Sequence, residues 1–184
     1  PGRPEKAAAL AFRDASISHD KNGIYGEMFV AAMIAAAFFA DSAASIVTAG
    51  LNEIPKDSRL AAAVRATQSW CQEELACGAP DWEQVWTKIN EHYGHYHGVH
   101  TINNAALVVL GVYFGFNDFE QGIVATTLAG WDTDCNAATV GSILGVNFGA
   151  KALPSKWTEV LNDRLTAAVR GENHNTLSQL AKRT

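Results

Sequence analysis

Two carboxylates stand two residues apart, at Asp132 and Asp134, directly after a glycine and ahead of a run of small apolar residues. Such a turn places acids at the N-terminus of the next helix, where unpaired amides and the helix dipole favour negative charge. With Thr133 and Asn136, the stretch offers carboxylate, hydroxyl and amide oxygens, which suit Mg²⁺ or Mn²⁺ rather than zinc. An N-cap is the plainer interpretation, although it explains only one acid. The spacing alone leaves a hard-metal site and a capping turn as equal alternatives.

Four histidines lie close together, at His92, His95, His97 and His100. A zinc or copper cluster is one interpretation, but the spacing lacks the i, i+4 pair that directs two imidazoles at one metal. A solvated or locally hydrogen-bonded connector is therefore the better interpretation. We expect His100 to help cap the helix that follows it.

Three further side chains are candidates for a ligand site. His19 stands at the expected end of a helix, where a structural role is the usual one. The small residues and the Tyr25 ring that follow His19 make a ligand contact the alternative. Trp131 lies beside the two acids and is a candidate pocket wall, whereas the other tryptophans sit at core spacing and need no special role. Cys135 stands where a thiolate is favoured, but no base accompanies it, so a nucleophilic role ranks low.

The composition excludes several classes of protein. The 184 residues are 48% hydrophobic and 18% charged, which suits one compact domain. A net charge of −5 without a basic run argues against a nucleic-acid groove. The three cysteines form no paired framework, so we expect reduced thiols and a cytoplasmic protein. The longest apolar run, residues 28–40, is too short to cross a membrane and predicts a buried helix.

Helical periodicity dominates the chain, and no stretch alternates as a strand would. The predicted helices cover residues 4–18, 24–40, 43–52, 58–75, 82–93, 103–114, 118–129, 137–149 and 157–168, with weak helix at 177–181. We expect an all-α fold, a compact bundle of roughly eight to ten helices with segments 24–40 and 103–114 near its centre. Residues 1–170 are expected to form the domain and residues 171–184 a polar tail.

Small residues recur every fourth position after the acids, at Ala137, Gly141, Gly145 and Gly149. Each glycine inside a helix costs about 1 kcal/mol relative to alanine. We therefore expect either close packing of another backbone along this face or a helix N-terminus that needs room around a ligand.

The stretch 130–141 closely resembles the C-terminal metal motif of the ADP-ribosylglycohydrolase family, which includes the J1 crystallins. Residues 14–19 with Tyr25 and Gly26 resemble the central histidine segment of that family. Its later helices and the segment after its metal helix are matched by residues 100–105, 115–119 and 153–157. The resemblance runs in order over most of the chain, and the aspartate motif is specific.

The resemblance implies that the compact multi-helix bundle is orthogonal. It also implies an all-α hydrolase that binds two Mg²⁺ or Mn²⁺ ions and cleaves ADP-ribose from an ADP-ribosylated protein or a small ADP-ribosyl compound. Carried over to this chain, Asp132 and Asp134 are metal ligands, and Cys135 stands at a third ligand position. His19 would face the substrate, with Tyr25 and Trp131 as weaker candidates for the pocket wall.

The chain departs from the family pattern in two ways. Many members have threonine where this chain has Cys135, and a thiol suits a hard ion poorly. Asn136 or water would then complete the coordination shell of that ion. The family's N-terminal half also carries a Gly-Asp-Ala-x-Gly motif and a Thr-Asp-Asp-Thr run, which supply the other metal ligands and usually the catalytic acid, and neither occurs here. We therefore expect the C-terminal portion of a longer enzyme, with the missing N-terminal segment as a partner.

Two hypotheses follow from the resemblance. The first is an ADP-ribosyl hydrolase whose 184 residues alone bind divalent ions weakly and do not turn over substrate. The second is a non-catalytic, structural or ADP-ribose-binding relative of the crystallin type. Retention of Asp132 and Asp134 favours the first. Apolar surface left on the central helices would also allow self-association.

Overall fold

The computed structural model describes residues 1–183 and confirms the predicted all-α fold, with ten α-helices among these residues. The chain divides into two units, Pro1–Phe148 and a second that begins at Gly149, so the expected boundary at residue 170 lies inside the second unit. The first unit contains α1 (Pro4–Ala15), α2 (Asn22–Ala37), α3 (Ala43–Asn52), α4 (Arg59–Leu75), α5 (Trp82–Tyr93), α6 (Thr101–Gly115), α7 (Phe119–Leu128) and α8 (Thr133–Phe148). Within the described residues, no helix is long and apolar enough to span a membrane.

Side-chain caps start several helices where the sequence places Ser or Asp. Ser42 accepts a hydrogen bond from the Ser45 amide at the start of α3, and Ser58 accepts one from the Ala61 amide at the start of α4. Asp81 and Asp118 cap α5 and α7 in the same way. These short polar side chains satisfy amide donors that a helix leaves unpaired at its first turn.

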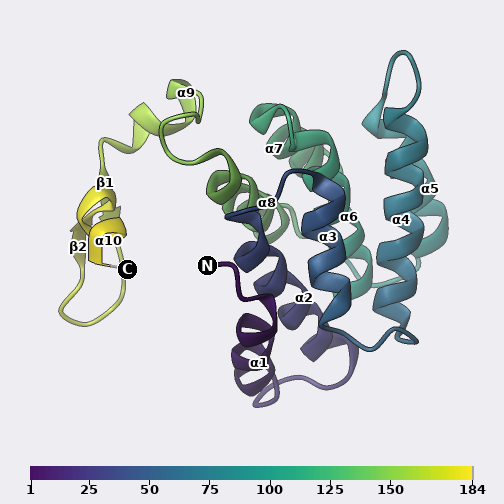
Figure 1. Ribbon diagram of the computed structural model, residues 1–184, viewed down its shortest axis with the longest axis horizontal. Helices are drawn as coiled ribbons and strands as arrows, with labels where there is room; N and C mark the ends of the chain where they lie inside the picture. The colour runs from purple at the N-terminus through teal and green to yellow at the C-terminus, as the bar shows by residue number, and fades with distance from the viewer. Residues whose placement is uncertain (184) are drawn as a thin grey trace. The chain divides into compact units, whose positions relative to one another are not determined.

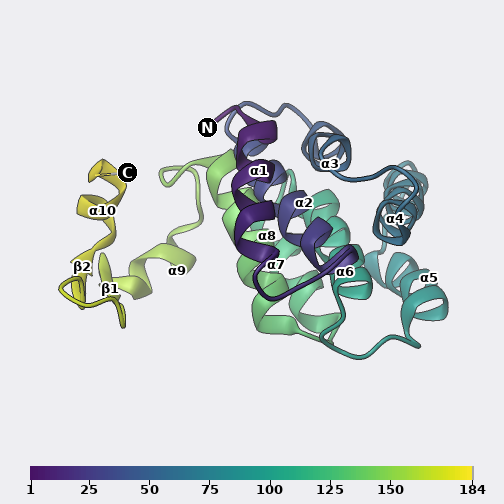
Figure 2. The same cartoon turned by 90° about the horizontal axis from the view of Figure 1, so that it is seen from below.

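Helix α6 is the core of the first unit, as its nearly all-apolar sequence predicts. Every residue from Ile102 to Gly115 is buried. Figures 1 and 2 show α6 in the interior, with α4 and α5 on one side and α2 and α8 on the other. Helices α6 and α7 approach each other closely at Gly115 and Gly122. A Cβ atom on Gly115 would lie only 2.7 Å from the Gly122 Cα atom. The central position of α6 brings its N-terminal end beneath the Asp132 turn.

Helix α8 begins at Thr133, four residues earlier than predicted, so Asp134 and Cys135 lie in its first turn. Its far end is fixed by Asn147, whose Nδ2 donates to the carbonyl oxygens of Ala37 and Ala40 at 3.0 Å each. The expected close packing of another backbone along the glycine face is absent from the described residues. A Cβ atom on Gly141 would meet only Ile123, at 3.4 Å, and one on Gly145 would meet nothing within 4 Å.

The second unit differs from the prediction in two ways: the helix expected at 157–168 is short, and a strand pair occurs where none was predicted. The expected helix at 157–168 is limited to α9 (Ser155–Thr158) and a 3-10 turn at Glu159–Leu161. Asn162 and Asp163 then have φ angles of 48° and 54°, a left-handed conformation that cannot continue a right-handed helix. A strand pair follows, β1 (Arg164–Thr166) antiparallel to β2 (His174–Thr176), and α10 (Leu177–Arg183) is the last described element.

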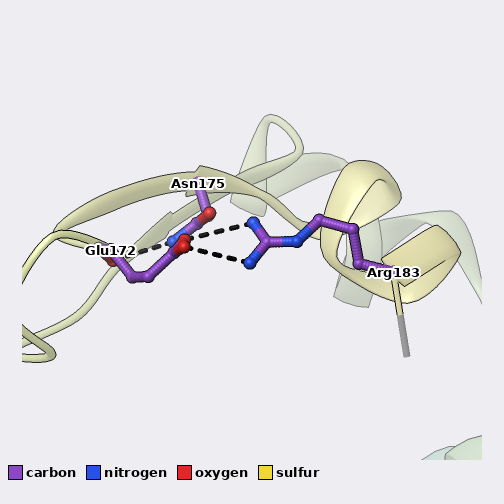
Figure 3. A network of polar contacts seen from close by, with 3 residues as sticks. All are labelled: Glu172, Asn175 and Arg183. Atoms are coloured by element: carbon purple, nitrogen blue, oxygen red, sulfur yellow. Dashed lines mark hydrogen bonds and ion pairs between the residues drawn. The ribbon is translucent and has the colours of Figure 1, made fainter.

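An exposed ion pair between Arg183 and Glu172 connects two segments of the second unit. The Arg183 guanidinium donates to both carboxylate oxygens of Glu172 at 3.0 and 3.1 Å (Figure 3). The Asn175 side chain donates to the Glu172 carbonyl at 2.7 Å. The Arg183 guanidinium also lowers the pKa of Glu172. The ion pair joins the end of α10 to the loop between β1 and β2.

Candidate metal centre

The turn between α7 and α8 has an unusual backbone. Gly130 and Trp131 have φ angles of 88° and 55°, and a positive φ is rare for a residue with a bulky side chain. The indole Nε1 of Trp86 on α5 donates to the Ala129 carbonyl at 2.8 Å just before these two residues. After them, the Asp132 carbonyl accepts the Asn136 amide at 2.9 Å, which starts α8. Asp132 therefore stands at the N-cap position, and its carboxylate lies at the head of the helix.

Three side chains bring potential ligand atoms together at this turn. One atom each from Asp132, Asp134 and Cys135 lies within 4.8 Å of the others, with Asp132 half-buried and the other two exposed. The carboxylates fit a hard divalent ion, and the positive end of the α8 dipole accommodates their charge. Cys135 fits such an ion less well, because a hydrogen bond to the Asp132 carboxylate and its charge raise the pKa of the thiol. The two carboxylates are therefore suitable ligands for Mg²⁺ or Mn²⁺, whereas the thiol is a weak ligand for either ion.

A concavity of 330 Å³ opens at this turn and is lined by α2, α6 and α8. Asp132, Cys135 and Asn136 lie on one side of it, and Glu27 and Asn104 are among the residues on the others. Gly26 on α2 packs against the Thr101 side chain on α6, where a larger residue would clash. Because Gly26 lets α2 and α6 approach here, Glu27 and Asp132 line one space.

Glu27 is the further carboxyl group in this concavity. Partial burial, then the charge and hydrogen bond of Asp14 on α1, raise the pKa of Glu27, and His19 opposes that shift. A carboxyl group with a raised pKa is closer to the protonation range that acid–base chemistry needs. Glu27 had no role in the sequence prediction, because it lies in an apolar helix far from the aspartate motif.

A second concavity, of 910 Å³, lies at the start of three helices. Its lining includes His19, Lys21, Arg59 and His100, together with Asp20 and the first residues of α2, α4 and α6. Helix N-termini and cationic side chains both favour anions. The two concavities share Val99 and Thr101, so a single extended ligand could occupy both.

The comparisons with known proteins identify the chain at the level of a family. The family model for ADP-ribosylglycohydrolase matches residues 1–184. The chain belongs to the ADP-ribosylglycohydrolase family. No curated protein and no solved structure matches it.

Within this ADP-ribosylglycohydrolase family member, the predicted site residues occupy different places. Asp132 and Cys135 line the smaller concavity and His19 lines the larger one. The His19 side chain lies against the first turn of α2, where a Cβ atom on Gly23 would lie 3.0 Å from its Cβ atom and 3.1 Å from its ring. Tyr25 is half-buried on α2, and Trp131 is half-buried in the turn. Neither ring is among the described residues that line these two concavities.

The histidine-rich segment is a connector, as its spacing predicts. His100 Nδ1 accepts the Ile102 amide at 3.2 Å and caps α6, which confirms the predicted cap. His97 Nδ1 accepts the Val99 amide at 3.3 Å, and the Tyr96 ring stacks on His100 with centroids 4.4 Å apart. Within residues 1–183, the histidines form no group of three metal-ligating side chains.

Two residues that support the turn had no role in the sequence prediction. Asn104 Oδ1 accepts the Asp132 amide at 3.3 Å and the Asn136 Nδ2 group at 2.7 Å. Trp86, which helical spacing assigned to the core, donates to Ala129. Both partners lie more than twenty residues away in the sequence, so no local pattern could connect them to the turn.

Proposed function

We propose that this chain carries the metal site of a hydrolase that removes ADP-ribose from an acceptor, with Mg²⁺ or Mn²⁺ as the cofactor. The observation that carries the proposal is the convergence of ligand atoms from Asp132, Asp134 and Cys135 at one turn, beside a concavity that Asp132 lines, in a member of the ADP-ribosylglycohydrolase family. Hydrolysis breaks the bond between the ribose anomeric carbon and the acceptor, and water is added across it.

The two acids supply the negative oxygens that a hard divalent ion requires. When bound, such an ion lowers the pKa of a coordinated water and neutralises developing negative charge. Asp132 and Asp134 would hold the ion at the α8 N-terminus. Glu27 lines the concavity with Asp132 and is a candidate proton donor or acceptor. The ribose ring of the substrate would lie in this smaller concavity.

The larger concavity suits the diphosphate of an ADP-ribosyl group. Lys21 and Arg59 are exposed cations on its lining, and a diphosphate is recognised well by a guanidinium fork and an ammonium group. His19 lies between the two regions, because it lines the larger concavity and also acts on the pKa of Glu27 in the smaller one. A substrate in this orientation would place its acceptor beyond the ribose, near the Asp132 turn.

A non-catalytic ADP-ribose-binding protein is the second candidate function. Three potential protein ligands, one of them a thiol, leave much of the coordination sphere of about six for Mg²⁺ to other groups. We therefore expect weak metal binding by the 184 residues alone. Such a site could hold ADP-ribose through a metal without cleaving the bond to an acceptor.

Calorimetry with ADP-ribose, at saturating Mn²⁺ and after chelation, tests the proposal. We expect binding that requires Mn²⁺, is lost in Asp132→Asn, and weakens in Arg59→Ala without loss of Mn²⁺ affinity. Arg65→Ala on the same helix is the matched control, because the Arg65 guanidinium instead donates to the Lys56 carbonyl. An ADP-ribose affinity that is unchanged both by removal of the metal and by Asp132→Asn would contradict the proposed site.

Incubation with an ADP-ribosylated arginine peptide then separates the two candidate functions. Release of free ADP-ribose, measured by mass spectrometry and stopped by chelation, would establish the hydrolase and show that the chain alone is sufficient. Metal-dependent ADP-ribose binding without release agrees with the weak-site expectation and keeps the binding protein as the alternative.

A further inference from the structure

Asn104 is a buried amide that joins three segments of the first unit. Its side chain lies on the first turns of α6 and is only 9% exposed. Nδ2 donates to the Gly98 carbonyl at 2.8 Å and to the His100 carbonyl at 2.9 Å. Oδ1 accepts the Asp132 amide at 3.3 Å and Asn136 Nδ2 at 2.7 Å. One side chain thus connects the histidine-rich connector, the central helix and the acid turn.

The chemistry of the partners fixes the orientation of this amide. The two groups on the connector side are carbonyl oxygens, which only accept hydrogen bonds. The Asp132 amide on the turn side only donates. An aspartate at 104 would lose both bonds to the connector, and an apolar residue would lose all four. The site therefore requires the paired donor and acceptor of an amide.

The turn that Asn104 contacts needs an external anchor. Trp131 has a φ angle of 55°, which side chains of its size rarely adopt, and Gly130 before it also has a positive φ. The following residue, Asp132, is the one whose amide Asn104 accepts. Asn136, one turn further along α8, is 4% exposed and shares the same Oδ1 atom. Asn104 thus holds both ends of the segment from 132 to 136 that carries the ligand atoms.

We propose that Asn104 is the positioning residue of the metal centre, and that its amide fixes the Asp132 turn in the geometry that binds the ion. This inference rests on the proposed metal site. Asn104 acts on the ion through Asp132 and Asn136 rather than by contact with the metal. Outer-shell partners of this kind commonly change metal affinity by roughly 10- to 100-fold when they are removed.

The first test is an Mn²⁺ titration followed by electron paramagnetic resonance, with the melting temperature of each variant measured in parallel. We expect Asn104→Ala to weaken Mn²⁺ binding by at least about tenfold. Asn103→Ala is the matched control, because Asn103 is also buried on α6 and donates to the connector, at the His97 carbonyl, rather than to the turn. Asn103→Ala is expected to lower the melting temperature and to leave the Mn²⁺ affinity near the wild-type value. Equal loss of affinity in both variants, or none in Asn104→Ala, would overturn the inference.

The second test needs no metal, and so separates failure of this inference from failure of the proposed metal site. Hydrogen exchange of the metal-free protein is expected to accelerate at the Asp132 amide in Asn104→Ala and to stay unchanged there in Asn103→Ala. Asn104→Asp keeps the acceptor toward the turn and loses the donors toward the connector. It should therefore accelerate exchange over residues 97–100 and leave Asp132 protected, even if Asn104→Ala does not fold. Faster exchange at Asp132 with an unchanged connector in Asn104→Asp would refute the assigned role.

Discussion

At position 135 a soft sulfur stands beside two hard carboxylates. The Cys135 thiol is exposed, and the Asp132 carboxylate raises its pKa by hydrogen bonding and charge. A protonated thiol offers little to Mg²⁺ or Mn²⁺, whereas a thiolate would favour softer ions. We therefore expect residue 135 to influence which class of metal the turn prefers.

Replacement of Cys135 with threonine should shift this preference toward hard ions. One additional oxygen ligand worth about 1.4 kcal/mol corresponds to roughly tenfold tighter Mn²⁺ binding. Cd²⁺ binding should weaken in the same variant, because the soft ligand is lost. Titration of both ions, by paramagnetic resonance for Mn²⁺ and calorimetry for Cd²⁺, measures the two effects.

Cys77→Thr provides the control, because Cys77 is another exposed thiol and lies outside the acid turn. Its replacement should leave both metal affinities unchanged. If Cys135→Thr moved the two affinities in the same direction, ligand hardness would not be the cause.

The sequence was informative about this site where the signal is local. Asp132, Asp134 and Cys135 lie in four consecutive residues, and a single helix start brings them together. Asn104 and Glu27 also line the concavity, but they come from apolar helices that only the tertiary fold places there. Trp131 is next to the acids in sequence, yet its positive φ could not be read from residue type.

At the scale of an element, the N-terminus of α6 depends on a histidine that must stay neutral. His100 Nδ1 accepts the Ile102 amide, and only an unprotonated nitrogen can accept. Burial, followed by the charges of Arg59 and His95, lowers the pKa of His100 below its ordinary value of 6.5. The cap that starts the central helix is therefore sensitive to acid.

The pH dependence of stability follows from this shift. Because the folded state lowers the pKa of His100, the unfolded chain takes up the proton first as the pH falls. The stability that neutral His100 contributes is complete above about pH 6.5 and is lost as the pH falls toward the folded-state value. His100→Asn keeps an N-cap without a titrating group. The wild-type melting temperature should therefore fall more than that of His100→Asn between about pH 7.5 and pH 5.

The measured quantity is the difference between the melting temperatures of wild type and His100→Asn at each pH. The contributions of titrating groups that both proteins share cancel in this difference. His97→Asn serves as a second reference, because His97 caps the Val99 amide in the connector and not the helix itself. Parallel profiles for wild type and His100→Asn would contradict the assigned role of His100.

Helix boundaries were predictable where a cap and an apolar run coincide. Ser42 and Ser58 cap α3 and α4, whose predicted starts at residues 43 and 58 agree with the structure to within one residue. The segment 157–168 has helical spacing at Trp157, Val160 and Leu161, but its side chains are at most half-buried. Periodicity without burial did not sustain a helix there, and Asn162 and Asp163 turn the chain instead.

At the scale of the whole molecule, burial is distributed very unevenly between the two units. The first unit contains the entire buried core, centred on α6. In residues 149–183 no residue is buried, and the described contacts include the surface pair of Glu172 and Arg183. Exposed ion pairs add little stability, and chains below about 40 residues rarely fold without disulfides, metals or partners.

A chain shortened to residues 1–148 should therefore retain the fold and the metal centre. Its far-ultraviolet circular dichroism should show more helix per residue than the full chain, and its thermal transition should stay cooperative. Its Mn²⁺ affinity should equal that of the full chain, because every residue that lines the smaller concavity precedes Phe148. A peptide of residues 149–184 should give a coil spectrum, since it has no buried core to offset the entropy of ordering. Cooperative unfolding of that peptide would show that the second unit folds independently, and loss of Mn²⁺ binding from the shortened chain would show that the metal centre depends on the second unit.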